Sequence, residues 1–94
     1  MSLQRIKIEY SSHFLSERRK YIKNNLKRFE DLKKVSVLFL SNPTHPSLNV
    51  EKLRGVKEVR TLRLNKGDRI FFFWKEKNIA LFIDIGKHDK YRKY

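Results

Sequence analysis

The fold is decided by the stretch Val59-Arg60-Thr61-Leu62-Arg63-Leu64-Asn65-Lys66-Gly67-Asp68-Arg69-Ile70-Phe71-Phe72-Phe73-Trp74. Two runs rich in β-branched, aromatic and large aliphatic residues flank Asn65-Lys66-Gly67, an arrangement typical of a β-hairpin. A three-residue loop with glycine last, where a positive φ is needed, is a common hairpin geometry. The stretch therefore predicts two antiparallel strands joined at this loop.

The register of this hairpin brings two arginines together. It pairs Arg63 with Arg69, Thr61 with Phe71 and Val59 with Phe73. Like charges directly opposite on a sheet are destabilising, so an anion such as a phosphate is expected to make the arginine pair tolerable. The alternatives are two solvated arginines on an exposed face, or a two-residue loop that moves the register by one.

Length and charge define the class of protein. The 94 residues predict a single domain, residues 1–94, with a modest core. Lys and Arg number 23 against 10 acidic residues, for a formal net charge of +13. This balance favours a polyanionic partner, meaning nucleic acid, an acidic protein or an anionic membrane surface. The 39% hydrophobic and 13% aromatic content argues against disorder.

Several functional classes are disfavoured by composition. No stretch has the length and apolarity of a transmembrane helix, and no secretory signal opens the chain. The absence of cysteine removes disulfides, thiolate catalysis and Cys-based zinc sites. The three histidines, His13, His45 and His88, are scattered, so we expect no catalytic metal and no cofactor. A cytoplasmic protein without membrane contact is predicted.

The N-terminal half predicts one strand and two helices. Ile6–Tyr10 alternates apolar and polar residues, as a strand does, and Ser11 and Ser12 are candidate helix N-caps. From about residue 12 to 41 apolar residues recur near a 3.6-residue period, with a break near Asn24-Asn25 that makes a helical hairpin. Val35–Leu40 has strand propensity, but the helical period continues through it. The basic residues between the apolar ones are either solvated or support binding electrostatically.

The C-terminal half predicts the rest of a sheet. Asn42–Ser47 ends the helix because its prolines cannot continue it, and Leu48–Gly55 is read as a linker. After the hairpin, Ile79–Ile85 predicts a last strand with its isoleucines and Leu81 on one face. The fold class is therefore α+β, an N-terminal strand, a helical hairpin and a three-stranded antiparallel meander (β-α-α-β-β-β), with helices on one face of the sheet.

The hairpin residues divide between two faces of that sheet. Ile70, Phe72 and Trp74 are expected beneath the helices. The other, partly open face is expected to carry Arg63, Arg69, Phe71, Phe73 and Phe82. The basic tail that follows Gly86 is expected to curl toward this open face and bring His88 near the arginines.

If His88, Arg63, Arg69 and Lys52 converge, the set suits cleavage of RNA by its own 2′-hydroxyl. Arginine gives phosphate a bidentate, permanently charged partner. Histidine titrates near neutrality and can donate a proton to the leaving 5′-oxygen. Phe71 and other aromatic residues beside a groove can stack an unpaired base, although a place in the small core is the alternative for them.

The same residues carry a family resemblance. They are the runs His45-Pro46-Ser47-Leu48, Lys52-Leu53-Arg54-Gly55, Arg63-Leu64, Arg69-Ile70 and Ile85-Gly86-Lys87-His88-Asp89, followed by Tyr91. In this order they resemble the RelE/ParE toxin superfamily from about residue 43 onward. The resemblance implies the β-α-α-β-β-β fold and a toxin of a type II toxin–antitoxin pair, often a ribosome-dependent, metal-independent endoribonuclease that cleaves mRNA. It also implies an acidic antitoxin that wraps the toxin in a hetero-oligomer.

The resemblance also implies roles for individual residues. Arg63 and Arg69 match basic residues that hold the scissile phosphate, and His88 matches an Arg or His that assists the leaving group. Tyr91 matches a tail aromatic that orients the substrate, a place that Tyr94 can also fill. Contacts with RNA are expected from Lys52, Arg54, Arg60, Lys87 and Phe71.

One departure from the family concerns the general base. A lysine that serves as base in some members corresponds here to Thr61 or Arg60, and arginine is a poor base. Glu51 and Glu58 are candidate replacements. Two other functions therefore stay open: a ParE-like toxin that inhibits DNA gyrase, and a basic nucleic-acid-binding module without catalysis.

Overall fold

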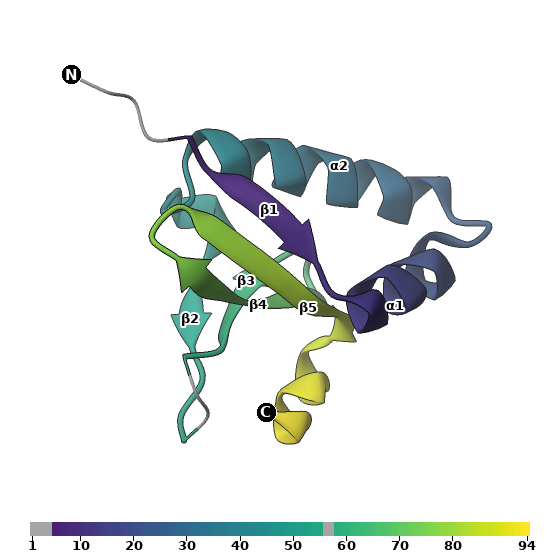
Figure 1. Ribbon diagram of the computed structural model, residues 1–94. Helices are drawn as coiled ribbons and strands as arrows, with labels where there is room; N and C mark the ends of the chain where they lie inside the picture. Colours follow the sequence, from purple (N-terminus) through teal and green to yellow (C-terminus); the bar gives the residue numbers. More distant parts are fainter. Residues whose placement is uncertain (1–4, 56–57) are drawn as a thin grey trace.

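The computed structural model describes residues 5–55 and 58–94 and shows two helices packed on a mixed sheet (Figure 1). The elements, in chain order, are β1 (Lys7–Tyr10), α1 (Ser12–Ile22), α2 (Leu26–Ser41), the short 3₁₀ helix η1 (Pro46–Leu48), β2 (Glu51–Lys52), β3 (Arg60–Arg63), β4 (Asp68–Glu76), β5 (Ile79–Lys87) and a C-terminal 3₁₀ helix η2 (His88–Lys93). The predicted α+β class is confirmed.

The sheet has five strands in the order β1-β5-β4-β3-β2. The predicted meander is β3-β4-β5, and β1 pairs with β5 in parallel. The prediction missed β2, because a strand of two residues carries no periodic signal. It lies in the segment expected to be a linker and pairs with β3 through Glu51↔Thr61 and Lys52↔Arg60. Among the described residues, no helix is long and apolar enough to cross a membrane.

Each helix of the helical hairpin begins at a side-chain cap. The Ser11 hydroxyl accepts a hydrogen bond from the Phe14 N–H at 3.0 Å, which caps α1. The break lies where it was predicted: Asn24 has a φ of 54°, and the Asn25 side chain accepts from the Arg28 N–H at 3.1 Å to cap α2. Val35–Leu40 belongs to α2, so the helical period outweighs strand propensity there.

The hairpin register is confirmed, because Arg63 pairs with Arg69 and Thr61 with Phe71. The predicted loop mechanism is wrong in one respect, since Gly67 does not have a positive φ. The Asn65 side chain holds the loop instead, accepting from the N–H groups of Gly67 and Asp68 at 3.1 and 3.0 Å.

An aromatic cluster forms the core between the helices and the sheet. Phe39 on α2 packs against Phe72 and Phe82 with ring centroids 5.3 and 5.5 Å apart, and stacks on Trp74 at 5.7 Å. Phe82 was expected on the open face and lies in this core instead. The reason is a register shift between the Phe71–Asp84 and Phe72–Phe82 pairs, because a bulge breaks the alternation of side chains.

The same shift moves three other residues of β5. Ile79, Leu81 and Ile83 were expected to share one face with Ile85 and are only half-buried, whereas Ala80 and Ile85 join Phe82 in the core.

We expect Phe39→Ala to lower the free energy of unfolding by about 3–5 kcal/mol, because truncating a fully buried ring removes contacts and leaves a cavity. Urea denaturation followed by circular dichroism measures this. The matched control is Val37→Ala on the exposed side of the same helix, which should change the free energy by no more than about 0.5 kcal/mol. Equal losses in both variants would contradict the assignment of the core.

Candidate functional site

The C-terminal tail forms one wall of a cleft. The His88 N–H donates to the Gly67 carbonyl at 3.1 Å, so η2 starts against the hairpin loop. In a 3₁₀ helix the side chains at i and i+3 are eclipsed, which places His88, Tyr91 and Tyr94 on one side of η2. These three line a cleft of about 370 Å³ whose other wall is the segment Glu51–Arg54.

This cleft gathers four of the residues predicted for the site. His88 and Tyr91 are exposed, with ring centroids 5.5 Å apart, and they face the segment that carries the exposed Lys52 and Arg54. Lys87, the residue before the tail, is exposed as well. A histidine and an aromatic ring opposite two cations can accept an anionic strand with an unpaired base.

Arg69 is a buried cation on the hairpin. Only 8% of its surface is exposed, and its Nη1 donates to the carbonyls of Asn65 and Asp68 at 3.2 and 3.0 Å. Within residues 5–55 and 58–94 its buried Nε–H finds no acceptor, and no carboxylate forms an ion pair with it. A buried charge without a counter-charge is costly, so this guanidinium favours binding of an anion.

The other arginines of the hairpin lie elsewhere. Arg63 is exposed and lines a separate hollow between α2 and the hairpin, together with Asp31 and Lys34. Arg60 is half-buried, 3.9 Å from Glu58. Neither Arg63 nor Arg69 lines the cleft of His88. The structure therefore brings His88 to the hairpin loop but leaves the arginine pair outside the cleft.

Phe71 does lie on the face opposite the helices, but it has no exposed surface. Its ring packs against Tyr94, with centroids 5.4 Å apart. No base can stack on Phe71 in this conformation, because the tail covers it. The aromatic side chain available to a base in the cleft is Tyr91, which is 41% exposed.

A hydrogen-bond network holds the hairpin loop against α1. The Tyr21 hydroxyl donates to Asp68 Oδ2 at 2.6 Å, and Asn65 Nδ2 donates to both groups at 3.0 and 3.1 Å. Burial, with the adjacent Asp68 carboxylate, raises the pKa of Tyr21. The sequence signal for this network was weak, since each residue alone is common in turns or helices.

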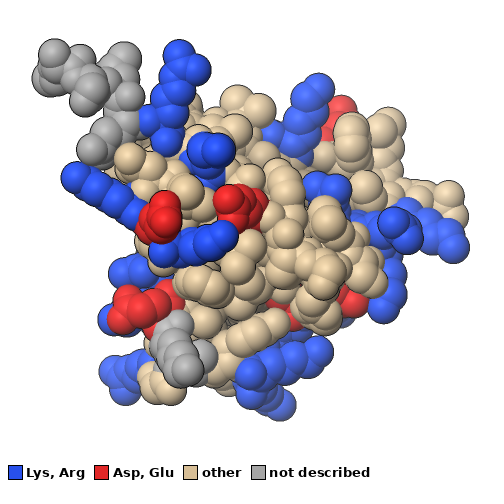
Figure 2. Space-filling view, in the orientation of Figure 1, with Lys and Arg blue, Asp and Glu red and all other residues tan. Residues whose placement is uncertain are grey.

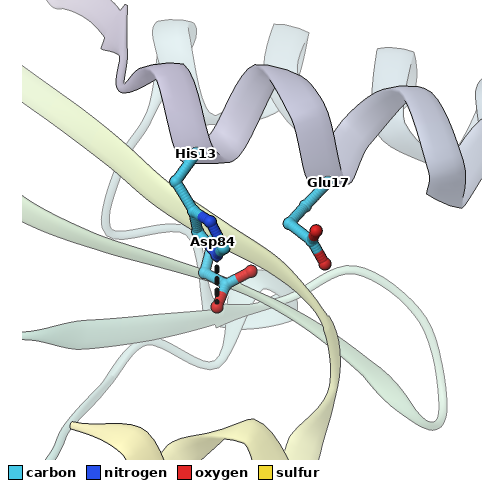
Figure 3. A group of neighbouring side chains, drawn as sticks. All are labelled: His13, Glu17 and Asp84. Atoms are coloured by element: carbon cyan, nitrogen blue, oxygen red, sulfur yellow. Dashed lines mark ion pairs between the residues drawn. The ribbon is translucent and has the colours of Figure 1, made fainter.

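Within the described residues, His13, Glu17 and Asp84 form a group that could hold a cation, with ligand atoms within 4.8 Å of one another (Figure 3). His13 and Glu17 are one helical turn apart on α1, and Asp84 comes from β5. His13 Nε2 lies 3.4 Å from Asp84 Oδ2. The ammonium group of Lys90 lies 2.9 Å from both carboxylates, so a cation of the chain itself neutralises this group.

The sequence signal for this cluster was a single acidic residue within the apolar strand Ile79–Ile85. Asp84 has no exposed surface, unlike most carboxylates. Outside such clusters the surface is basic: Figure 2 shows many Lys and Arg side chains around the visible face and few Asp or Glu.

No family model and no curated protein matches this sequence. Similar solved structures include the Escherichia coli DinJ–YafQ toxin–antitoxin complex, with a TM-score of 0.72, 21% identity and coverage of 94% of this chain and 97% of that one. The YoeB/ParE toxin from Agrobacterium tumefaciens has a TM-score of 0.73 at 12% identity, covering 88% and 99%. The YoeB dimer from Staphylococcus aureus has 0.68 at 17%, covering 89% and 98%. The chain thus shares the fold of these toxin structures, which is the fold that the sequence resemblance implied.

We expect sulfate, a stand-in for phosphate, to stabilise the protein through Arg69. At about tenfold above the dissociation constant, sulfate should raise the free energy of unfolding by about 1.4 kcal/mol, measured by urea denaturation against chloride at equal ionic strength. Arg69→Met should lose this increment. Arg19→Met, at an exposed position on α1, should keep it and so separates site binding from the general stabilising effect of sulfate. Equal increments in all three proteins would contradict an anion site at Arg69.

Proposed function

We propose that this protein is the toxin of a type II toxin–antitoxin pair and an endoribonuclease that cleaves mRNA on the ribosome through attack of the 2′-hydroxyl. The observation that carries the proposal is the cleft in which His88 and Tyr91 face Lys52 and Arg54. The uncompensated Arg69 guanidinium lies on the loop to which His88 is hydrogen-bonded. The shared fold supports the same proposal.

The phosphate is assigned to the arginines. The reaction passes through a phosphorane with added negative charge, and preorganised positive groups aimed at such charge are commonly the largest catalytic contribution. Arg69 is preorganised, because two loop carbonyls hold its guanidinium and burial restricts its motion. Arg63, its partner across the hairpin, lines a different hollow, so we assign it to another phosphate of the RNA strand and not to the scissile one.

His88 is assigned as the general acid. Its ring is exposed at the start of η2, while its backbone N–H is fixed to Gly67. In the proposed step, the 2′-oxygen forms a bond to phosphorus and the bond from phosphorus to the 5′-oxygen breaks. The His88 imidazolium donates its proton to that departing oxygen, which leaves a 2′,3′-cyclic phosphate.

The two candidates for the general base differ in their surroundings. Glu58 lies within 3.6 Å of Lys52 and 3.9 Å of Arg60, so two cations engage its carboxylate. Glu51 lines the cleft together with His88 and forms no ion pair within the described part of the chain. We assign Glu51 to accept the 2′-hydroxyl proton.

The remaining cleft residues are assigned to binding. The Tyr91 ring offers a stacking surface for a base, an interaction worth roughly 1–3 kcal/mol per base. Lys52, Arg54, Arg60 and Lys87 are assigned to the RNA backbone, where phosphate contacts make binding depend on salt.

The proposed protein partner is an acidic antitoxin in a hetero-oligomer. The net charge of +13 favours an acidic polypeptide. Leu26, Phe29, Val37 and Leu40 leave apolar side chains exposed on α2, as a partner-binding helix would. Among proteins of this fold, the DinJ–YafQ complex pairs a toxin with an antitoxin.

We expect His88→Ala and Glu51→Gln to reduce cleavage of ribosome-bound mRNA by roughly 10²- to 10⁴-fold each, the range for loss of an acid or a base. Both side chains are exposed, so the fold should survive. The measurement is the cleavage rate on purified ribosomes programmed with mRNA, read by primer extension. Lys77→Ala, at an exposed turn position outside the cleft, is the control and should cleave at the wild-type rate. Wild-type rates in both site variants would refute the assigned roles.

The alternative function is inhibition of DNA gyrase. It is favoured by the likeness to a YoeB/ParE toxin and by the absence of a lysine at the family's base position. This alternative predicts that the protein blocks gyrase supercoiling at a concentration that leaves ribosome-bound mRNA intact, and that His88→Ala still does so. A plain nucleic-acid-binding module would do neither, and its expression would not arrest growth. Supercoiling and cleavage assays on one preparation distinguish the three.

A further inference from the structure

The side chain of Lys90 fastens the C-terminal tail to the body of the protein. Its Nζ donates to Glu17 Oε1 at 2.9 Å, to Asp84 Oδ1 at 2.9 Å and to the Ile85 carbonyl at 2.8 Å. All three N–H groups of the ammonium are therefore used. We call Lys90, Glu17 and Asp84 the lysine clip.

The chain makes room for this lysine at Gly86. A Cβ at position 86 would lie 2.8 Å from Lys90 Cε, and the φ of Gly86 is +148°, which side-chain-bearing residues rarely adopt. Glycine at the end of β5 thus lets the lysine stem cross directly over the backbone.

Asp84 is the buried end of the clip. Its carboxylate also accepts from the Ile85 N–H and from the Tyr94 hydroxyl, both at 2.8 Å. Burial alone would raise the pKa of this carboxyl, but the hydrogen bonds from Lys90, Tyr94 and Ile85 outweigh it and lower the pKa. The carboxylate is thus ionised at neutral pH and holds the tail at two points.

The tail needs such anchors because a 3₁₀ helix is a weak structure. Runs beyond about four residues are uncommon, since the hydrogen-bond geometry is poor, and η2 has six. The first anchor of η2 is the His88 N–H, which is fixed to Gly67, and the second is the lysine clip at Lys90. His88 and Tyr91 lie around these two anchors and face the cleft.

We propose that the lysine clip positions His88 and Tyr91 for catalysis, with Lys90 as a positioning residue that touches neither RNA nor the reacting atoms. This inference rests on the proposed endoribonuclease function. Without the ammonium, Asp84 and Glu17 are two neighbouring carboxylates without their shared cation. The tail then loses its attachment to α1 and keeps only the Tyr94 hydroxyl on Asp84 of β5. His88 is then held opposite Glu51 only through its backbone N–H on Gly67.

The first experiment compares Lys90→Met with Lys93→Met. Both remove one ammonium from η2, but Lys93 is exposed and forms no ion pair within the described residues. For Lys90→Met we expect backbone order parameters of residues 88–94 to fall below about 0.6, the range of flexible segments. We expect kcat on ribosome-bound mRNA to fall roughly 100-fold, the effect of a small misplacement of a catalytic group, with KM within about threefold. Lys93→Met should match the wild type in each measurement.

The second experiment tests whether Lys90 acts through His88. If it does, the double variant His88→Ala/Lys90→Met should cleave no more slowly than His88→Ala alone, because residues that act as one unit are not additive. A further loss of about 100-fold in the double variant would show an independent role and overturn the proposal. If Lys90→Met fails to fold, Glu17→Gln, at the partly exposed end of the clip, takes its place with the same expected pattern.

Failure of this inference differs from failure of the proposed function. If the wild type cleaves no ribosome-bound mRNA, the proposed function is wrong. The order parameters of residues 88–94 then still test whether the lysine clip holds the tail in place. A tail that stays ordered in Lys90→Met overturns the clip. A tail that is released while kcat stays at the wild-type value overturns its catalytic role.

Discussion

The arrangement of the site depends on the hydrogen bonds that the buried carboxylate of Asp84 accepts. A charge without solvent exposure must be compensated by donors, and here they come from β5, from Lys90 and from Tyr94. His13 on α1 lies 3.4 Å from it. Well-packed apolar residues often give equal or greater stability than such a cluster. The carboxylate also ties both Lys90 and Tyr94 to one point on β5, which defines where the tail lies.

The contacts made by the acidic residues also affect the charge of the surface. Hydrogen bonds from other side chains of the protein are accepted by the carboxylates of Glu17, Asp31, Asp68 and Asp84. The other six acidic residues are far outnumbered by the 23 Lys and Arg residues, so the net charge of +13 is expressed at the surface. A field of this sign raises the encounter rate with a polyanion. It does not select an RNA over an acidic protein, so selection has to come from the cleft.

The sequence predicted those features that depend on neighbours in the chain. The helix break at Asn24-Asn25 and the pairing of Arg63 with Arg69 follow from local capping and from loop length. Phe82 was misplaced because a bulge, which no period-2 pattern reveals, shifts the register of β5. The tail does curl toward the open face as predicted, with Tyr94 packed on Phe71. Its anchor was not predicted, because Lys90 reaches Glu17, 73 positions away.

For the candidate site as well, the sequence identified residues but did not determine where each of them lies. The sequence named Lys52, Arg54, His88 and Tyr91, and the cleft brings them together, whereas Arg63 faces another hollow. The hairpin loop connects the residue proposed to bind phosphate with the one proposed to donate a proton, because its carbonyls hold both the Arg69 guanidinium and the His88 N–H.

That loop is in turn hydrogen-bonded to α1 through Tyr21, Asn65 and Asp68. The lysine clip attaches the other end of the tail to the same helix through Glu17. Helix α1 is therefore a common support for the loop and for the tail, although it contributes no residue to the cleft. A partner that moved α1 relative to the sheet would shift Arg69 and His88 together, so the geometry of the site depends on the packing of a helix outside it.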